Sequence, residues 1–558
     1  MPYIDWLGKD DVVHHHKEIP YKTISCQEIV GDIDNENMII KGDNLLALKS
    51  LLPYYANAVK MIYIDPPYNT GNTSWVYSDN SDSPLIKKWL DSTVNAEDLS
   101  RSDKWLCMMY PRLKLLRELL KEDGVIFISI NDSEFGHLRM ICDEIFGQKN
   151  LIETFIWNTD GNIDNQKKIK NNHEYILCYA KNSDTFKSPP IIDPNISLNS
   201  KLFKSAIKNT IIKNGVKNPI SKITIPKGFP TNFEKGFISK ELEGYPIKYT
   251  DIKVKNYKLE EEIIIESGWS SKQMLIDFIE NNFKPVVDSK GQSSIFYLTN
   301  PTGAIYVEKV RSSKQSHVLS VLQNFGSTQQ MSKTLASMNI KFDYPKPLSL
   351  IQYLLSLNDD KNAVILDSFA GTGTTAHAVL EKNRDGGHRK FILIELEDYA
   401  ETLTKERMKK VVKGYKGIFG KKKIEVKGLG GGFKYCELGV EIFDEFGELN
   451  SELTFEDIAK HIYFVEFKQP LKVESEALAP NSTKLKPSFQ NSYVGNHKKR
   501  HLYFFEERFK RVNMRKIAKE HYEYKEIIVY TCKCSISEDE LKKYKITVRY
   551  IPYDIKDN

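Results

Sequence analysis

The chain has 558 residues, of which 41% are hydrophobic and 28% are charged, and its formal net charge is +6. This composition is typical of a soluble globular protein, and the length predicts roughly three to four domains. No apolar run reaches the ~18 residues that a membrane-spanning helix needs. The amino terminus lacks the basic and apolar parts of a secretory signal, and seven scattered cysteines are too few for a disulfide framework. We therefore expect a cytoplasmic protein without membrane contact.

The sequence predicts no metal site. Cys532 and Cys534 form a close pair, but a structural zinc site needs a matching pair of ligands, and the sequence offers none. His14, His15 and His16 are adjacent. Adjacent side chains cannot converge on one ion as ligands along one helix face do, so a solvated turn is the better interpretation.

The first half of the chain alternates between strand and helix patterns. Residues 38–43 form a short apolar run that ends at a carboxylate, 45–52 carry leucines at helical spacing, and 59–64 form a second apolar run. A strand, a helix and a strand in this order are typical of a parallel sheet. The alternation continues with a helix over 99–121, a strand over 125–130, a helix over 132–146, and strands over 151–157 and 175–180. We therefore predict a doubly wound, Rossmann-like α/β core.

The alternation stops near residue 183 and returns near residue 344. Residues 183–342 show short strand-like pieces without a strand–helix–strand unit, which predicts an inserted domain with its own small core. Residues 181–250 contain twelve Lys and five Asp or Glu, a local excess that suits phosphate contacts and a solvated surface equally well. The returning pattern predicts a helix over 348–357, a strand over 364–367, a helix over 374–382, a strand over 391–395 and a helix over 399–412.

These patterns divide the chain into six predicted segments. They are an N-terminal segment (1–36), the first half of the core (37–182), the inserted domain (183–342), the second half of the core (343–415), a linker (416–432) and a smaller C-terminal α+β domain (433–558). The linker is predicted from a run of three lysines and a cluster of glycines. The long polar stretch 72–98 is interpreted as a lid over the candidate site that precedes it.

The first candidate site follows the strand predicted over 59–64. Asp65, Pro66, Pro67 and Tyr68 come directly after it. Proline fixes the backbone and has no N–H, so we expect both proline carbonyls to stand unpaired beside the Asp65 carboxylate. These oxygens form a cluster of hydrogen-bond acceptors, and Tyr68 adds a flat aromatic face. A planar group with an exocyclic amine, such as a nucleobase, fits this arrangement.

The second candidate site is a strand-to-helix junction with the sequence Asp-Ser-Phe-Ala-Gly-Thr-Gly-Thr at 367–374. Gly371 and Gly373 let a ligand approach the backbone at the amino end of the following helix. Neither the dinucleotide nor the P-loop spacing is met. Glu395 ends the next predicted strand, where a doubly wound fold places the acid that binds a ribose. A nucleoside ligand without phosphates fits all of this, whereas a simple helix-entry turn would explain the glycines alone.

The Asp-Pro-Pro-Tyr at 65–68 and the Phe-x-Gly-x-Gly at 369–373 resemble the catalytic and cofactor motifs of S-adenosylmethionine-dependent DNA amino-methyltransferases. Their order, with the catalytic motif first, is that of the β class. Further stretches, at 6–9, 130–132, 172–175 and 344–347, resemble the modification subunit of type III restriction-modification systems. The resemblance covers residues 1–182 and 343–445, and in this family the target recognition domain lies in the insert between them.

The resemblance implies transfer of a methyl group to the N6 amine of a flipped adenine. Asp65 and the carbonyl of Pro66, held by the rigid turn that Pro67 completes, would accept hydrogen bonds from that amine, and Tyr68 would stack on the base. The residues implied in S-adenosylmethionine binding are Asp367, Phe369, Gly371, Gly373 and Thr374, with Glu395 on the ribose, Asp43 near the adenine and Lys346 near the cofactor.

The resemblance also implies double-stranded DNA as the substrate, a restriction subunit with helicase and nuclease activity as a partner, a homodimer, and a bacterial cytoplasm. Asp at position 65, where cytosine-N4 enzymes usually carry Ser, favours adenine. A stand-alone methyltransferase without a nuclease partner is the first alternative. A DNA-binding specificity subunit without methylation is the second, and the intact motifs argue against it. A methyltransferase of RNA or protein is the third, and the Asp and the basic insert favour DNA instead.

Overall fold

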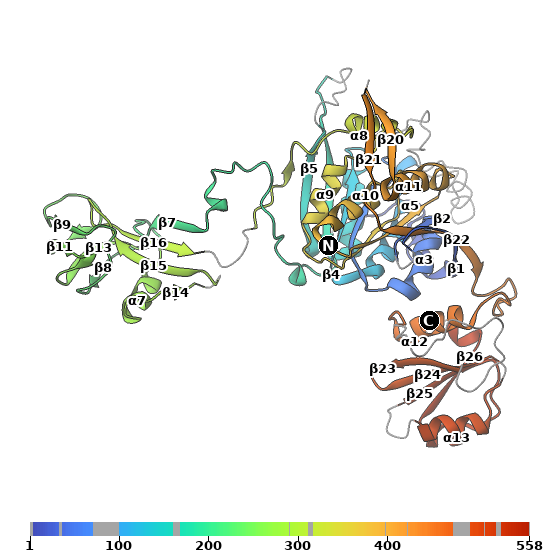
Figure 1. The fold of residues 1–558 in the computed structure, drawn as a ribbon. Helices are drawn as coiled ribbons and strands as arrows, with labels where there is room; N and C mark the ends of the chain where they lie inside the picture. The colour runs from blue at the N-terminus through green and yellow to red at the C-terminus, as the bar shows by residue number, and fades with distance from the viewer. Residues whose placement is uncertain are drawn as a thin grey trace. The chain divides into compact units, whose positions relative to one another are not determined.

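The computed structural model describes residues 4–32, 36–70, 100–159, 168–288, 291–310, 316–396, 398–420, 422–471, 492–506, 508–520 and 526–556. The chain forms two compact units, one of Met1–Ser188 with Leu319–Asn558 and the other of Pro189–Val318 (Figure 1). The stretch 72–98, interpreted as a lid, lies outside the described residues. None of the helices in the described ranges combines the length and the apolar character that a bilayer crossing requires.

A ten-stranded sheet forms the centre of the first unit, with the order β1-β22-β2-β19-β18-β3-β4-β6-β5-β17. The strands are β1 (Lys22–Gly31), β22 (Gly432–Glu441), β2 (Met38–Lys41), β19 (Lys390–Glu395), β18 (Val364–Asp367), β3 (Val59–Ile64), β4 (Leu120–Ile130), β6 (His173–Ala180), β5 (Leu151–Asn158) and β17 (Val321–Leu322). Neighbours from β22 to β4 are parallel, whereas β1 and β6 pair antiparallel with β22 and β4. This arrangement confirms the predicted doubly wound α/β core.

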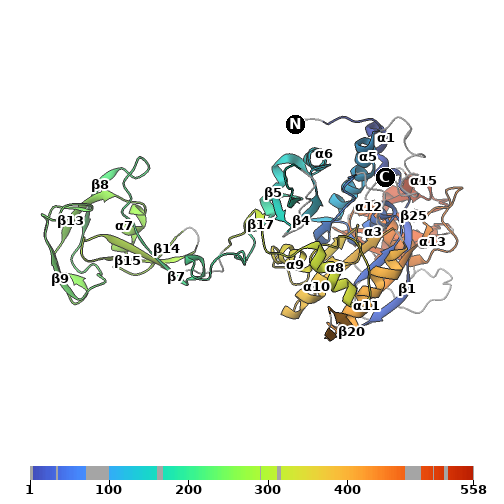
Figure 2. The ribbon, with the colours of Figure 1, turned by 90° about the horizontal axis from the view of Figure 1, so that it is seen from above.

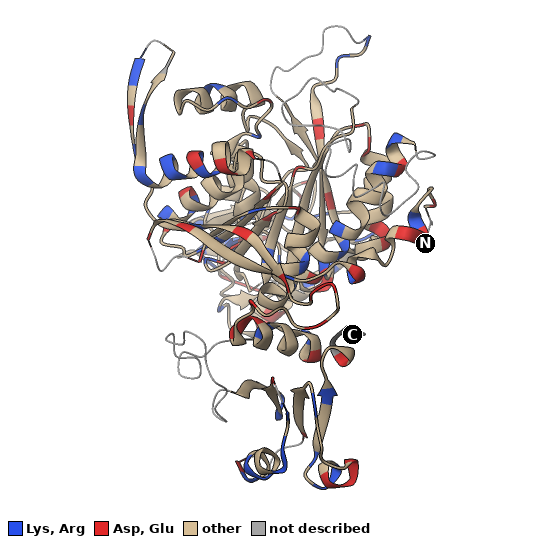
Figure 3. Ribbon diagram, turned by 90° about the vertical axis from the view of Figure 1, so that its right-hand side faces the viewer, with Lys and Arg blue, Asp and Glu red and all other residues tan. Residues whose placement is uncertain are grey.

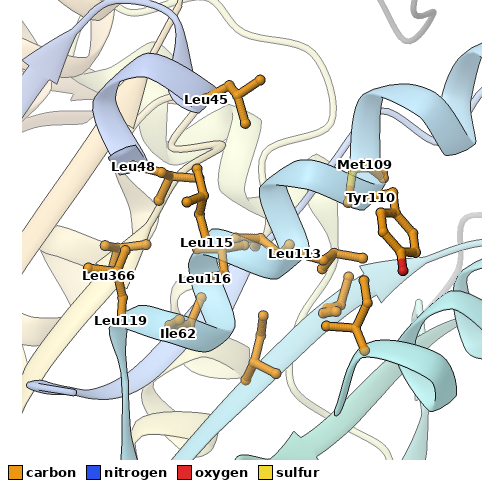
Figure 4. Close-up of a cluster of buried hydrophobic side chains, with 14 of the residues drawn as sticks. Leu45, Leu48, Ile62, Met109, Tyr110, Leu113, Leu115, Leu116, Leu119 and Leu366 are labelled. Atoms are coloured by element: carbon orange, nitrogen blue, oxygen red, sulfur yellow. The ribbon is translucent and has the colours of Figure 1, made fainter. Parts of the chain in front are cut away.

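Helices cover both faces of this sheet. Helices α3 (Asn44–Tyr55), α5 (Arg101–Leu119) and α6 (Phe135–Cys142) pack on one face, and α9 (Leu348–Ser356) and α10 (Thr374–Lys382) lie on the other (Figure 2). Leu48 of α3 and Leu116 of α5 are fully buried in one core cluster with Ile62 of β3 and Leu366 of β18 (Figure 4). The periodic leucines that predicted the helices are thus the residues that form the core.

The second unit is a small antiparallel domain with its own core. Its sheets are β8 (Ile220–Ile225), β13 (Ile263–Gly268) and β10 (Ile247–Lys248); β9 (Lys235–Ile238), β11 (Ile252–Lys255) and β12 (Lys258–Leu259); and β14 (Val286–Val287), β15 (Ser293–Leu298), β16 (Ile305–Val310) and β7 (Ala206–Thr210). Phe278 of α7 (Lys272–Glu280), Phe296 and Phe229 are buried together. This unit is shorter than the predicted insert 183–342, because β17 pairs with β5 of the ten-stranded sheet.

The prediction of a linker over 416–432 was wrong. Strands β20 (Gly414–Phe419) and β21 (Lys422–Lys427) pair as a hairpin in this segment (Figure 3). Lys416 and Glu425 lie 3.4 Å apart across it. Gly428 and Gly432, which follow, lie where the backbone is closely packed. A Cβ on Gly432 would lie 2.5 Å from the Val30 carbonyl, which shows that the backbone of β22 is too near its neighbour for any side chain.

The last part of the chain belongs to the first unit. Strand β22, predicted as part of the C-terminal domain, belongs instead to the ten-stranded sheet, where it pairs with β1 and β2. A separate four-stranded sheet follows, with β23 (Tyr493–His497), β24 (Arg500–Phe505), β25 (Glu526–Thr531) and β26 (Ile546–Tyr550). Helix α12 (Phe455–Phe467) contacts α3, and its His461 ring lies 4.7 Å from the ring of Tyr21.

Replacing Leu116 by Ala should destabilise the first unit, because Leu116 is fully buried and the smaller side chain leaves a cavity. We expect the free energy of unfolding, measured by urea denaturation, to fall by about 2–5 kcal/mol. The matched control is Leu7→Ala, because the Leu7 side chain is 59% exposed. An equal loss in both variants would contradict this description of the core.

Candidate active site

Two loops that are far apart in the sequence meet at the carboxyl edge of the central strands. Strands β3 and β18 are parallel neighbours, and their register places Ile365 beside Met61 and Leu366 beside Ile62. The residues that follow both strands therefore emerge side by side. A pocket at this point is lined by side chains from segments 63–68, 342–346 and 367–375. The two motifs singled out in the sequence as separate sites thus line one pocket.

Lys346 lies at the centre of the acceptor cluster. Its ammonium nitrogen Nζ is 2.9 Å from Asp65 Oδ2, 3.0 Å from Asp65 Oδ1, 2.8 Å from the Tyr68 hydroxyl and 3.3 Å from Glu174 Oε2. Burial by itself would lower the pKa of Lys346, but the carboxylates of Asp65 and Glu174 outweigh burial and raise it. Lys346 therefore remains an ammonium, held between two anions.

The Tyr68 hydroxyl completes this cluster. It lies 2.9 Å from both Asp65 Oδ1 and Glu174 Oε2, and it can donate its single proton to either. Burial and the two carboxylates raise the pKa of Tyr68 well above its ordinary value, so the phenol stays neutral. Because its oxygen also accepts a hydrogen bond from Lys346, the position of the ring is fixed from its polar end.

The turn at Pro66 and Pro67 is held in place by contacts outside the Lys346 cluster. The indole N–H of Trp105 donates to the carbonyl of Pro67 at 2.7 Å, so the expectation that both proline carbonyls stand unpaired was wrong. The reason is that Trp105 is fully buried and its N–H needs an acceptor. Asn69 follows with a left-handed φ of 60°, and its side chain donates to Glu134 at 2.6 Å. These contacts make the turn rigid.

The second loop is shaped by its glycines. Gly371 and Gly373 have φ of 52° and 79°, a region that favours glycine. A Cβ on Gly373 would lie 3.1 Å from the side chain of Thr404, so this position has little room for a larger residue. Glu395 accepts hydrogen bonds from the backbone N–H groups of Gly371 at 2.7 Å and Leu396 at 2.8 Å. The predicted ribose-binding acid is thus attached directly to the glycine loop.

Asp367 sits beneath the same loop. Its carboxyl accepts hydrogen bonds from the backbone N–H of Phe369 at 3.1 Å and the hydroxyl of Thr375 at 2.6 Å. Burial nevertheless raises the pKa of Asp367 to about 7, and the charge of Asp65 adds to the increase. Near neutral pH this carboxyl is therefore present in both protonation states.

Asp43 does not line the pocket. Its Oδ1 accepts hydrogen bonds from the backbone N–H groups of Leu45 at 2.9 Å and Leu46 at 3.0 Å, which caps the amino end of α3. Its Oδ2 lies 3.4 Å from the guanidinium of the buried Arg112. The observed contacts are structural, and a contact of Asp43 with a cofactor stays a prediction.

Glu174 was missing from the residues singled out as functional in the sequence. It lies at the start of β6, and its carboxylate contacts both the Lys346 ammonium and the Tyr68 hydroxyl. The Asn-His-Glu-Tyr stretch at 172–175 was the available signal, although it indicated a family and not a role.

Arg407 was also missed. It is fully buried in α11 (Glu406–Lys413), and its guanidinium donates to the hydroxyls of Thr372 at 2.7 Å and Thr374 at 2.9 Å. Burial lowers the pKa of Arg407 to about 9. Through these two hydrogen bonds the Arg407 side chain holds the glycine loop in place.

Within the described part of the chain, no cluster of three or more His, Cys, Asp or Glu could hold a metal ion.

Comparison with known proteins gives a family and several relatives. The family described as DNA methylase matches residues 59–406. The chain is 34% identical to the type III restriction-modification enzyme EcoPI Mod subunit of Escherichia phage P1 over 451 residues. This alignment covers 75% of this chain and 66% of the relative. It is 32% identical over 419 residues to the StyLTI Mod subunit of Salmonella typhimurium, with coverages of 71% and 58%. The chain thus spans two thirds or less of the length of these two relatives.

A shorter relative has a different description. The type II methyltransferase M.KpnI of Klebsiella pneumoniae is 30% identical over 365 residues, which cover 63% of this chain and 79% of the relative.

Asp367→Asn should remove a pH dependence of stability. The folded-state pKa of Asp367 is about 7, whereas an unfolded Asp titrates near ~3.9. The folded state binds more protons between these values, so the stabilisation by Asp367 is fully present below pH ~4 and is lost as the pH rises through about 7. We expect the wild-type melting temperature, measured by calorimetry, to fall relative to that of Asp367→Asn from about pH 5 to about pH 8. Parallel curves would contradict a buried carboxyl that titrates near neutrality.

Proposed function

We propose that this chain, which belongs to the DNA methylase family, transfers a methyl group from S-adenosylmethionine to the N6 amine of an adenine in double-stranded DNA. The observation that carries the proposal is that the Asp-Pro-Pro-Tyr turn (65–68) and the glycine loop (369–374) line one pocket. The acceptors of the turn can bind an amine, and the glycine loop can hold the methyl donor beside it.

The residues of the pocket fit S-adenosylmethionine. The glycine loop leaves the backbone open to a nucleoside, and Phe369 and Thr374 line the pocket beside it. Two carboxylates against one ammonium leave an excess of negative charge that suits a sulfonium cation. When bound, the cofactor supplies an activated methyl group. We assign Asp367, Phe369, Gly371, Gly373 and Thr374 to its binding, with Glu395 on the ribose and Asp43 near the adenine.

The acceptor residues act on the target amine. An adenine amine is a poor nucleophile because its lone pair is delocalised into the ring, and acceptors that bind both N–H bonds favour the tetrahedral form that can react. Asp65 offers one acceptor and the carbonyl of Pro66 the other, on a turn that Trp105 holds rigid. The target base must leave the duplex to reach them, and stacking on Tyr68 offsets part of the unstacking cost of a few kcal/mol.

The choice of adenine over cytosine is supported by Asp65 itself, because the resembling cytosine-N4 enzymes usually carry Ser there. A carboxylate is a stronger acceptor than a hydroxyl and adds negative charge beside the amine.

We further propose that the chain is the modification and recognition subunit of a type III restriction-modification system. The identity to the EcoPI and StyLTI Mod subunits supports this. The proposal includes a restriction subunit as a partner and a homodimer of this chain. The identity to M.KpnI favours a second candidate, a methyltransferase that works alone. Co-purification of a helicase-nuclease chain with the tagged protein from its native cells distinguishes the two.

A row of lysines in the second unit supports DNA binding. Lys235 of β9, Lys255 of β11 and Lys258 of β12 are exposed and stand directly opposite one another across the three strands. Like charges at such positions destabilise a sheet. Lys253 on the same face pairs with Glu261 at 3.5 Å, but the described residues provide no carboxylate partner for the three lysines of the row. A phosphate backbone would relieve their repulsion.

The proposed reaction is tested by incubating the purified protein with S-adenosylmethionine and unmethylated bacterial DNA and then analysing the nucleosides by mass spectrometry. We expect N6-methyladenine to accumulate. Accumulation of N4-methylcytosine would correct the target base, and absence of both modified bases, with cofactor binding intact, would refute the proposed activity.

Asp65→Ala should abolish methyl transfer, with a loss of about 10²-fold or more because an electrostatic contact to the developing charge is removed. S-adenosylmethionine binding, measured by calorimetry, should stay close to wild type. The control is Asp359→Ala, which removes an exposed carboxylate elsewhere in the same unit. Loss of cofactor binding together with transfer would show that Asp65 has a structural role instead.

Replacing the three lysines of the row by Gln should weaken DNA binding and lower the slope of log affinity against log salt by up to about three. Fluorescence anisotropy with a labelled duplex at several salt concentrations measures both quantities. The matched control changes three exposed lysines of the same unit that do not form a row, namely Lys213, Lys217 and Lys284. The net charge is then identical, and an equal effect of the control would show that only total charge matters.

A further inference from the structure

The group proposed to receive the target amine is already in contact with a cation. Both carboxylate oxygens of Asp65 lie within 3.0 Å of the Lys346 ammonium. Oδ1 is in addition 2.9 Å from the Tyr68 hydroxyl. Lys346 and Tyr68 together occupy three of the roughly four lone-pair positions that a carboxylate offers. Movement of Lys346 away from Asp65 would free two of these positions for an adenine amine.

A second carboxylate, that of Glu174, already contacts Lys346. Glu174 Oε2 is 3.3 Å from the Lys346 nitrogen and 2.9 Å from the Tyr68 hydroxyl. The hydroxyl can turn its proton from Asp65 to Glu174, because it lies at the same distance from both carboxylates. Lys346 can therefore leave Asp65 without losing its ion pair. With no carboxylate in reach, the same movement would strand a buried ammonium, which is costly.

We propose that Glu174 is a positioning residue that takes Lys346 over from Asp65 when the target amine enters the pocket. Asp65 then becomes free to accept the amine, and the Tyr68 hydroxyl follows Lys346 toward Glu174. The inference rests on the proposed function, since it assigns a role to residues around the same amine. It adds that Lys346 stays paired with Asp65 in the absence of DNA.

The charge of the cluster supports this role. Asp65, Glu174 and Lys346 together carry one excess negative charge when all three are ionised. The amine nitrogen gains positive charge as it forms its new bond, and an excess negative charge beside it stabilises that change. Loss of Glu174 has two effects at once: the excess charge disappears, and Lys346 stays on Asp65. Loss of both Glu174 and Lys346 restores the excess charge and frees Asp65.

A set of four proteins tests the proposal: wild type, Glu174→Gln, Lys346→Met and the double variant. We expect Glu174→Gln to lower kcat for methyl transfer into DNA by about tenfold or more. The double variant should recover a substantial part of this loss. A structural role of Glu174 predicts the opposite, because removing two members of a buried cluster would then be at least as harmful as removing one. A double variant no more active than Glu174→Gln overturns the proposal.

A binding measurement provides a readout that does not depend on turnover. Once the target site is mapped, duplexes can carry either adenine or purine, which lacks the exocyclic amine, at the target position. Wild type should bind the adenine duplex more tightly. Glu174→Gln should lose this preference, and the double variant should regain it. Unchanged preference in Glu174→Gln would show that Lys346 does not need Glu174 to leave Asp65.

Controls separate this proposal from the proposed function and from misfolding. Glu153→Gln removes an exposed carboxylate from the neighbouring strand β5 and should match wild type. If wild type itself transfers no methyl group, the proposed function fails. If Glu174→Gln does not fold, Glu174→Asp keeps the charge with a shorter reach and should retain the adenine preference in part. A folded Glu174→Asp without any adenine preference, or with an undiminished one, would contradict the handover of Lys346.

Discussion

An ammonium shared by two carboxylates determines the geometry of the pocket. Lys346 precedes α9, Asp65 follows β3 and Glu174 lies on β6, so one cluster joins three segments that are far apart in the sequence. A buried ammonium is tolerated because both carboxylates pair with it. The cluster therefore holds the two halves of the core together at the position where the amine is proposed to bind.

The ten-stranded sheet and the helices around it make the two loops rigid. Parallel pairing of β3 with β18 sets the acceptor turn beside the glycine loop. Trp105 binds the turn through the Pro67 carbonyl, and Arg407 binds the glycine loop through two threonine hydroxyls. With both backbones fixed, long side chains such as Lys346 are the parts of the site best able to rearrange. A rigid backbone that carries a few movable side chains fits a reaction that depends mainly on positioning.

The sequence was sufficient to predict the α/β core and both motifs, because apolar periodicity and the prolines and glycines at strand ends are local signals. It could not show that Lys346 pairs with Asp65, since that contact depends on how separate segments meet in the fold. Glu174 and Arg407 were missed for the same reason. Gly428 and Gly432 were misinterpreted because close packing and flexibility both favour glycine, and only the neighbouring segments of the fold distinguish the two causes. Asp43 shows the reverse case, a predicted ligand-binding residue whose observed contacts cap a helix.

The central claim is that Asp65 accepts the amine of an adenine in DNA. Single-molecule sequencing of DNA from cells that express either the wild-type chain or Asp65→Ala tests it most directly, because it identifies the modified base and its surroundings together. We predict N6-methyladenine at one recurring sequence in cells with the wild-type chain and none above background at that sequence in cells with the variant. Modification at the same sequence in both, or modification of cytosine instead, would contradict the role of Asp65.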